Sequence, residues 1–289
     1  MTRKKTEPVL GDDFDLFLSR EVLLMAGGPN TGKSYSVARL IEDSVAGGYR
    51  VDVIDRDRGL GKALKELGLT ELPPSVRYTK ASTWADVEAG VQQAMELGAG
   101  DWVVLEMMGE FWNLSQTAYS EMVYGEGLTS HILALRAEAE AKVQEASLDS
   151  RSKAASSERQ RGVGYQGMEG RTDWSLIKRM HNTEVRDRLI ENSNANILAT
   201  TAVVPLDDER GAAAYPKWKR VGVRPEGEKH NVYKFDTWVY VEFRDGSYVW
   251  STDLGKGEGK DRGGRAFATR VPFDDTGLIM SMNDHFGAE

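Results

Sequence analysis

The feature that most constrains the fold of this chain is a glycine-rich segment at residues 27–34, which reads Gly-Gly-Pro-Asn-Thr-Gly-Lys-Ser. The apolar run Val22–Met25 precedes it and is long enough for one buried strand. After it, apolar residues recur at helical spacing up to a glycine pair: Val37, Leu40, Ile41 and Val45, then Gly47 and Gly48. The segment is therefore expected to form the turn between a buried strand and a helix.

This segment carries the spacing G-x-x-x-x-G-K-S, which is the phosphate-binding loop, or P-loop. Glycines let backbone N–H groups turn inward around phosphates, and the start of the helix adds its positive dipole end. Lys33 can reach the β- and γ-phosphates, and the hydroxyl of Ser34 can bind Mg²⁺. The structural alternative is a glycine-rich turn with an exposed lysine. The residues expected to bind ATP with Mg²⁺ are Gly27, Gly28, Pro29, Asn30, Thr31, Gly32, Lys33, Ser34 and Tyr35.

Strand and helix patterns alternate after this loop, which predicts an α/β fold with a mostly parallel central sheet and helices on both faces. Strands are predicted at 50–55, 76–79, 102–105 and 196–204, and helices at 62–67, 83–97 and 174–189. Strands at 237–243 and 247–251 flank Arg244-Asp245-Gly246, which indicates a hairpin. We expect this hairpin, and a strand at 266–271, to form an antiparallel C-terminal extension of the same sheet.

The domain organisation follows from changes in composition along the chain. Residues 1–20 read as a polar lead-in, 21–273 as the main domain and 274–289 as a tail. A charged insertion is expected at about 113–172. Within it, residues 128–160 predict a solvated helix or hairpin and residues 161–171 a glycine-rich loop.

Composition excludes several function classes. The chain has no cysteine, so disulfides, zinc fingers and thiol catalysis are excluded. A formal net charge of -8 argues against a strongly basic nucleic-acid binder, although a local basic groove remains compatible with it. No apolar run approaches the roughly 18 residues of a membrane helix, and no secretion signal precedes the first strand. We therefore expect a cytoplasmic protein with no membrane partner.

A P-loop protein needs an acidic residue at the tip of a neighbouring strand to hold the metal. The run Trp102-Val103-Val104-Leu105-Glu106 is an apolar strand that ends in a carboxylate. Glu106 is therefore the expected metal and catalytic residue together with Ser34, and Glu110 competes with it. The structural alternative is an ordinary acid at the end of a strand.

Hydrolysis also needs a group that orients or deprotonates water. Asp57, with Asp55 as the alternative, follows the strand at 50–55, and strand tips gather at the ligand-binding edge of such sheets. Thr201, next to Thr200, ends the strand that begins at Asn196 and is expected to touch the γ-phosphate or the attacking water. The structural alternative for Asp57 is a solvated loop after the strand. The alternative for Thr201 is a threonine with no functional role, because threonine is common in strands.

Four segments together resemble the RecA-like branch of the P-loop ATPases, especially the small core-only recombinase-type ATPases of phages. They read G-G-P-N-T-G-K-S, V-I-D-R-D-R-G-L, W-V-V-L-E and N-I-L-A-T-T-A. The resemblance spans residues 20–273 and implies a three-layer, RecA-like ATPase fold. It also implies an oligomer that acts in phage or bacterial DNA recombination, replication or packaging, and a setting in the host cytoplasm if a phage encodes the chain.

The resemblance also assigns residue roles. It places Asp57 where the family has a catalytic glutamate, and Glu106 where aspartate is usual, so slow turnover is expected. Lys260 or Arg262, in the segment G-K-D-R-G-G-R, would reach the γ-phosphate bound by a neighbouring subunit. A charged glycine-rich turn is the alternative for that segment.

Two basic segments with aromatic residues suit single-stranded DNA, which binds through phosphate attraction and base stacking. One has Tyr165 among basic residues, and the other is Lys217-Trp218-Lys219-Arg220 with Arg224. Acidic residues are interspersed in both, so a solvated charged face fits equally well. The basic residues around Tyr165 are Arg151, Lys153, Arg159, Arg161 and Arg171.

Two other functions fit the same motifs. A small-molecule or nucleotide kinase would use residues 151–171 as an arginine-bearing lid over the phosphates. A non-hydrolysing, ATP-dependent binding switch would explain the unusual acidic partners of the P-loop.

Overall fold

The computed structural model describes residues 20–148, 170–206, 222–228, 230–252 and 271–272. It divides into two compact units. The first contains the described residues up to Phe111 and from Glu184 onward, and the second contains those between Trp112 and Thr183.

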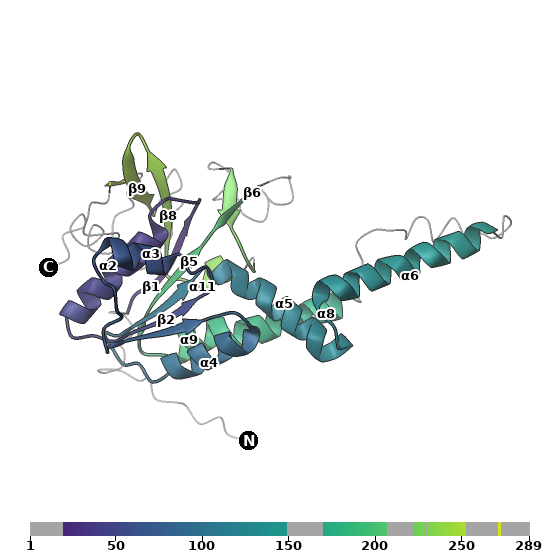
Figure 1. Ribbon diagram of the computed structural model, residues 1–289, viewed down its shortest axis with the longest axis horizontal. Helices are drawn as coiled ribbons and strands as arrows, with labels where there is room; N and C mark the ends of the chain where they lie inside the picture. The colour runs from purple at the N-terminus through teal and green to yellow at the C-terminus, as the bar shows by residue number, and fades with distance from the viewer. Residues whose placement is uncertain (1–19, 149–169, 207–221, 229, 253–270, 273–289) are drawn as a thin grey trace, which may run out of the picture. The chain divides into compact units, whose positions relative to one another are not determined.

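The first unit is built on an eight-stranded sheet with the order β10-β9-β8-β1-β5-β4-β2-β3 (Figure 1). The strands from β3 to β8 in this order are parallel, whereas β9 pairs antiparallel with both β8 and β10. This confirms the predicted α/β class with a mostly parallel sheet. The strands are β1 (Val22–Gly27), β2 (Val51–Asp55), β3 (Val76–Lys80), β4 (Trp102–Glu106), β5 (Asn196–Thr201), β8 (Thr237–Arg244), β9 (Ser247–Ser251) and β10 (Val271–Pro272).

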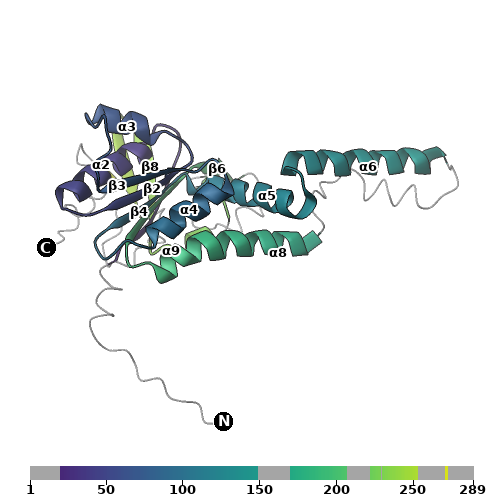
Figure 2. The ribbon, with the colours of Figure 1, turned by 60° about the horizontal axis from the view of Figure 1, so that its bottom comes forward.

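Helices cover both faces of this sheet (Figure 2). On one face α2 (Lys33–Ala46) and α3 (Leu60–Glu66) bury apolar side chains against alternate residues of the strands, such as Val53 and Val104. On the other face lies α4 (Trp84–Ala94), which contacts β2, β3 and α9 (Asp187–Asn192). Because both faces are covered, β1 is apolar and buried along its whole length.

The C-terminal hairpin forms as predicted, and its first strand joins the sheet in parallel. Positive φ angles at Asp245 (52°) and Gly246 (82°) make the two-residue turn between β8 and β9. The chain enters β8 from α11 (Asn231–Lys234), and β8 pairs in parallel with β1. The antiparallel part of the sheet therefore begins only at β9.

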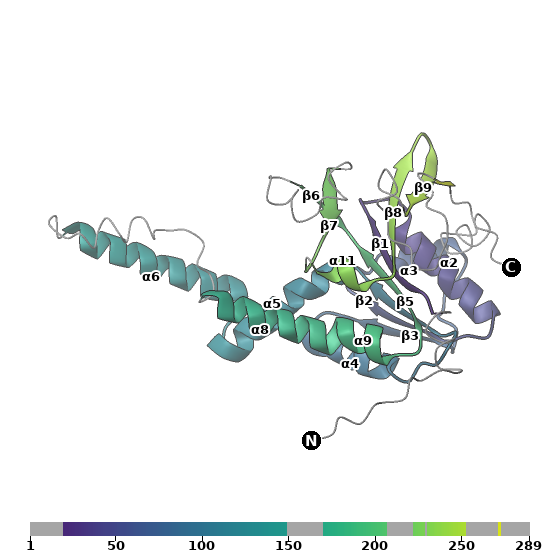
Figure 3. The same ribbon diagram turned by 180° about the vertical axis from the view of Figure 1, so that it is seen from behind.

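The long strand predicted at 196–204 is interrupted. β5 ends at Thr201, and β6 (Val203–Pro205) pairs instead with β7 (Val223–Pro225) in a separate two-stranded sheet (Figure 3). The apolar pattern of the sequence continues across Ala202, so it predicts a single strand. In the structure the chain passes from one sheet to the other at this residue.

The second unit is helical and carries its own small core. The sequence pattern did not predict α5 (Met108–Tyr124), whose later turns belong to this unit together with α6 (Leu128–Leu148) and α8 (Gly170–His181). Tyr119 and Ile177 are buried here, and the hydroxyls of Tyr119 and Tyr124 donate to the carboxylate of Asp173 at 2.7 and 2.8 Å. The α6 residue Leu133 is 58% exposed, as expected of a solvated helix.

A π-helical turn, η1 (Asn182–Arg186), leads from α8 into α9. Within the described ranges, no helix combines the length and apolar character needed to cross a bilayer.

We predict that Gly90→Val lowers the free energy of unfolding by about 1–3 kcal/mol, because it overpacks the contact between α4 and the sheet. A Cβ at Gly90 would lie 2.9 Å from Ile54 Cγ1 and 3.2 Å from Thr79 Cγ2. Urea denaturation measures the effect. The matched control is Gly61→Val in α3, whose Cβ would meet nothing within 4 Å. Equal stability of the two variants would contradict the packing described here.

Candidate functional site

The glycine-rich segment forms the turn between β1 and α2, as its spacing predicted. Gly32 precedes α2 with a φ of 89° and no side chain caps the helix, so the first N–H groups of α2 remain available to an anion. Gly27 lies against β8, and a Cβ there would lie 2.5 Å from the carbonyl oxygen of Val241. Only glycine fits this close approach.

The ammonium group of Lys33 lies over the loop. Its Nζ donates to the carbonyl oxygens of Gly27 at 2.8 Å and Gly28 at 2.7 Å. Burial lowers the pKa of Lys33, and the carboxylates of Glu106 and Asp57 oppose that shift. The lysine of the motif is thus held close to both predicted acidic residues.

Glu106 connects the P-loop helix to the sheet. The hydroxyl of Ser34 donates to Glu106 Oε1 at 2.6 Å, and the hydroxyl of Thr200 donates to Oε2 at 2.7 Å. The glutamate is 1% exposed, and this burial raises its pKa, whereas the two hydroxyl donors act in the opposite direction. A serine hydroxyl beside a carboxylate is an oxygen pair suited to Mg²⁺.

The register of the sheet explains why Thr200 meets Glu106. Leu105 pairs with Ala199, so the next residues, Glu106 and Thr200, lie side by side on one face. Thr201 points to the opposite face, where its hydroxyl donates to the carbonyl oxygen of Glu226 at 3.1 Å. The structure therefore brings Thr200 to Glu106, and not Thr201.

Asp55 organises the loop after β2. Its Oδ1 accepts from the N–H groups of Asp57 at 2.8 Å and Arg58 at 3.1 Å, and its Oδ2 accepts from the Tyr78 hydroxyl at 2.6 Å. Asp55 is fully buried, so its carboxylate serves the loop and not a solvent-accessible ligand.

Asp57 lies on the P-loop side of the same loop. A Cβ on Gly59 would lie 3.1 Å from Asp57 Oδ2 and 3.3 Å from Ser34 Oγ, so both groups adjoin this glycine. Of the two aspartates, Asp57 is the one placed near Ser34 and Lys33.

Glu110, the alternative to Glu106, lies in a different environment. Its N–H donates to the Met107 carbonyl at 2.9 Å in the first turn of α5. Its charge lies near Glu226, whose pKa is raised by burial first and by Glu110 second. The hydrogen bond from Ser34 goes to Glu106.

Backbone strain marks the same edge of the sheet. Non-glycine residues with positive φ occur after β1 (Asn30, 56°), after β2 (Arg58, 60°) and after β4 (Met107, 61°). Asparagine tolerates such a conformation, whereas in Arg58 and Met107 it costs about 1–3 kcal/mol and is typical of functional sites. These two strained residues directly follow Asp57 and Glu106.

Ser34 and Glu106 are the residues that could hold a divalent ion at this site. In the described part of the chain, no group of three or more histidine or acidic side chains could hold a metal ion. An ion at Ser34 and Glu106 would therefore need further oxygen ligands from phosphates and water, which is usual for Mg²⁺.

Several predicted residues lie outside the described ranges: Lys260, Arg262, Tyr165, Arg151, Lys153, Arg159, Arg161 and the segment 217–220. Of the other basic residues, Arg171 belongs to α8, and Arg224 in β7 donates to the carbonyl oxygen of Pro225 at 3.1 Å.

Sequence reasoning missed the contact of Thr200 with Glu106. It also missed that Gly59 adjoins Asp57 and Ser34, and that the Tyr78 hydroxyl donates to Asp55. Strand alternation places Thr200 and Thr201 on opposite faces of the sheet. Which of the two lies beside Glu106 depends on the register of β5 with β4. No signal in the sequence pairs Tyr78 with Asp55.

No protein-family model and no curated protein matches this chain. Its function is therefore inferred from the motif and the geometry of the site.

We predict that Glu106→Gln raises the melting temperature at pH 8 by about 2–4 °C, which corresponds to roughly 1 kcal/mol in a chain of this size. The raised pKa means that the folded protein favours the protonated glutamate. Ionisation of Glu106 therefore lowers the free energy of unfolding at a pH above its raised pKa. This loss of stability disappears as the pH falls below 4.5, the ordinary pKa of glutamate. Thermal unfolding of both proteins from pH 5 to 8 measures the difference.

The control is Glu66→Gln, which neutralises an exposed glutamate on α3 and should leave the melting temperature nearly unchanged. A lower melting temperature for Glu106→Gln at pH 8 would show that the ionised carboxylate stabilises the fold, against this prediction.

Proposed function

We propose that this chain is a RecA-like P-loop ATPase that binds ATP with Mg²⁺ and hydrolyses it slowly. One observation carries the proposal: the hydroxyl of the P-loop residue Ser34 donates to Glu106 at the end of β4, beside the ammonium of Lys33. A P-loop alone would support phosphate binding, whereas this pairing adds the acidic partner that a metal-dependent reaction needs.

In this proposal the P-loop holds the triphosphate. Backbone N–H groups between Gly27 and Tyr35 would bind the phosphate oxygens, and Lys33 would exchange its carbonyl partners for the β- and γ-phosphates. Ser34 and Glu106 would hold Mg²⁺, which would neutralise charge between the β- and γ-phosphates.

Asp57 is the proposed group that orients the attacking water and accepts its proton. The coupling of its charge to Lys33 supports this role. Thr200 is proposed to hold Glu106 in place through its hydroxyl. Aspartate is one methylene shorter than glutamate, so we propose that water is positioned less closely than in relatives with glutamate and that turnover is slow.

We further propose that the protein acts as an oligomer on single-stranded DNA, in phage or bacterial recombination, replication or packaging. This part rests on the resemblance of the four motifs to recombinase-type ATPases and on the basic aromatic segments. Lys260 or Arg262 of one copy would act on the nucleotide of the next.

The decisive experiment measures ATP turnover with and without single- and double-stranded DNA, with the native mass of the protein determined in parallel. Turnover that single-stranded DNA stimulates supports the whole proposal. ATP binding without phosphate release, with or without DNA, would favour the non-hydrolysing switch, and transfer of phosphate to a nucleoside or nucleotide would favour a kinase.

We predict that Lys33→Ala abolishes ATP hydrolysis and weakens ATP binding by about tenfold or more, because it removes a charge-assisted contact to the phosphates. Phosphate release and equilibrium binding measure the two effects. Lys62→Ala, which removes an exposed lysine of α3, is the matched control and should behave as the unaltered protein.

We predict that Asp57→Asn lowers kcat by about 100-fold or more and leaves ATP affinity within about threefold, since general base catalysis contributes 10²–10⁴-fold. Asp245→Asn is the control, because Asp245 is exposed in the β8–β9 turn and asparagine tolerates its positive φ. A normal kcat for Asp57→Asn would exclude Asp57 as the base.

A further inference from the structure

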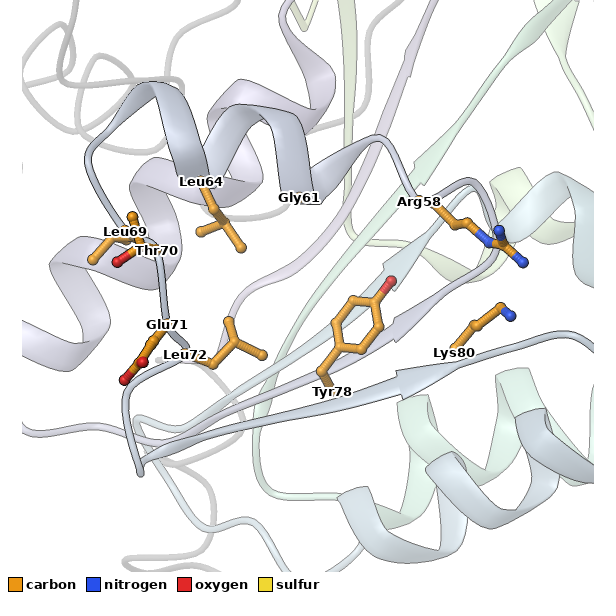
Figure 4. Close-up of a pocket in the computed structure, with 9 residues that line it drawn as sticks. All are labelled: Arg58, Gly61, Leu64, Leu69, Thr70, Glu71, Leu72, Tyr78 and Lys80. Atoms are coloured by element: carbon orange, nitrogen blue, oxygen red, sulfur yellow. The ribbon is translucent and has the colours of Figure 1, made fainter.

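A cavity in the first unit has no role in the proposed reaction. Its volume is about 480 Å³, which is within the usual range of ligand pockets, about 300–1,000 Å³. It opens beside β3, the edge strand of the sheet (Figure 4). The lining residues are Arg58, Gly61, Leu64, Leu69, Thr70, Glu71, Leu72, Tyr78 and Lys80.

The middle of the cavity is apolar and contains one aromatic ring. Leu64 is buried, whereas Leu72 and Tyr78 are 40% and 38% exposed. The ring of Tyr78 stands between Leu72 and Lys80 (Figure 4), and its hydroxyl is held by Asp55. A fixed aromatic ring beside leucine side chains suits a flat apolar group such as a nucleobase.

One end of the cavity is positively charged. Arg58 and Lys80 lie together at this end (Figure 4). Both are exposed, and within the described part of the chain neither side chain makes a hydrogen bond or a salt bridge. The backbone of Arg58 is fixed by its N–H bond to Asp55, so the loop presents this guanidinium at the cavity. Such a pair of cations suits a phosphate group.

The other end is polar and carries acceptors. Thr70 and Glu71 line it, both exposed, on the far side of Leu72 from Arg58 and Lys80. A hydroxyl and a carboxylate can accept hydrogen bonds from sugar hydroxyls or exocyclic amino groups.

We propose that this cavity binds a nucleoside 5′-phosphate unit. The phosphate contacts Arg58 and Lys80, the base lies on Tyr78 among the leucines, and Thr70 and Glu71 accept hydrogen bonds from the sugar or the base. The unit can come from a free mononucleotide or from one nucleotide of a single strand, because both present the same phosphate, sugar and base.

The cavity adjoins the loop that carries Asp57. Arg58 faces the cavity, whereas its neighbours Asp57 and Gly59 adjoin Ser34. Tyr78 and the loop share Asp55, which binds the Tyr78 hydroxyl and the N–H groups of Asp57 and Arg58. A bound nucleotide therefore acts on the position of Asp57 and changes the rate of ATP hydrolysis. This coupling rests on the proposed function, whereas binding in the cavity does not.

The test measures equilibrium binding of nucleoside 5′-monophosphates and of oligodeoxythymidylate to the full chain and to Lys33→Ala. The Lys33→Ala protein separates the cavity from the P-loop. We expect one mononucleotide site that Lys33→Ala retains. Arg58→Gln and Lys80→Gln should each weaken it about tenfold. Gly61→Phe should abolish it by filling the cavity, since a Cβ at Gly61 meets nothing within 4 Å.

Lys62→Gln, an exposed charge on α3 that does not line the cavity, is the matched control and should bind normally. Thermal unfolding of every variant checks that the fold is retained. Binding of mononucleotides identifies the free ligand as the source, and binding of the oligonucleotide alone identifies a strand.

The inference is overturned if neither probe binds to Lys33→Ala, or if Arg58→Gln, Lys80→Gln and Gly61→Phe all bind as the unaltered protein does. A different result would contradict the proposed function alone. In that case the unaltered protein hydrolyses no ATP under any condition, while Lys33→Ala still binds the mononucleotide.

Discussion

The buried carboxylate of Glu106 is the constraint on which the site depends. An ionised glutamate with 1% exposure needs hydrogen-bond donors, and the hydroxyls of Ser34 and Thr200 supply them. These two hydrogen bonds join the helix α2 to the carboxyl ends of the strands β4 and β5. Burial raises the pKa of Glu106 and lowers the pKa of Lys33, so it disfavours the charged form of each group.

A second buried carboxylate, Asp55, organises the loop that follows β2. It binds the N–H groups of the following loop and the hydroxyl of Tyr78, and thereby determines which residues of the loop face which side. Asp57 adjoins the P-loop, whereas Arg58, with its positive φ, lines the neighbouring cavity. One short loop thus adjoins both the glycine-rich segment and the cavity.

Much of the fold could be predicted from the sequence because its signals are local. The apolar run of β1, the glycines of the P-loop and the helical spacing in α2 each lie within a few residues, and the α/β class follows from their alternation with later strands. The helix α5 was missed because its sequence mixes polar and aromatic residues without a clear apolar stripe. The parallel pairing of β8 with β1 joins residues more than two hundred positions apart, which no local pattern encodes.

For the candidate site, the sequence alone located the glycine-rich segment 27–34 and the acidic residues that follow or end β2 and β4, because each is a short local pattern. Only the tertiary structure decided between Asp55 and Asp57 and between Thr200 and Thr201. Asp55 is the last residue of β2 and Asp57 lies in the following loop, whose path is fixed by hydrogen bonds to Asp55. Thr200 and Thr201 are neighbours on one strand and face opposite sides, so only the register with β4 assigns the sides. That register places Thr200 beside Glu106 and leaves Asp55 to hold the loop that carries Asp57.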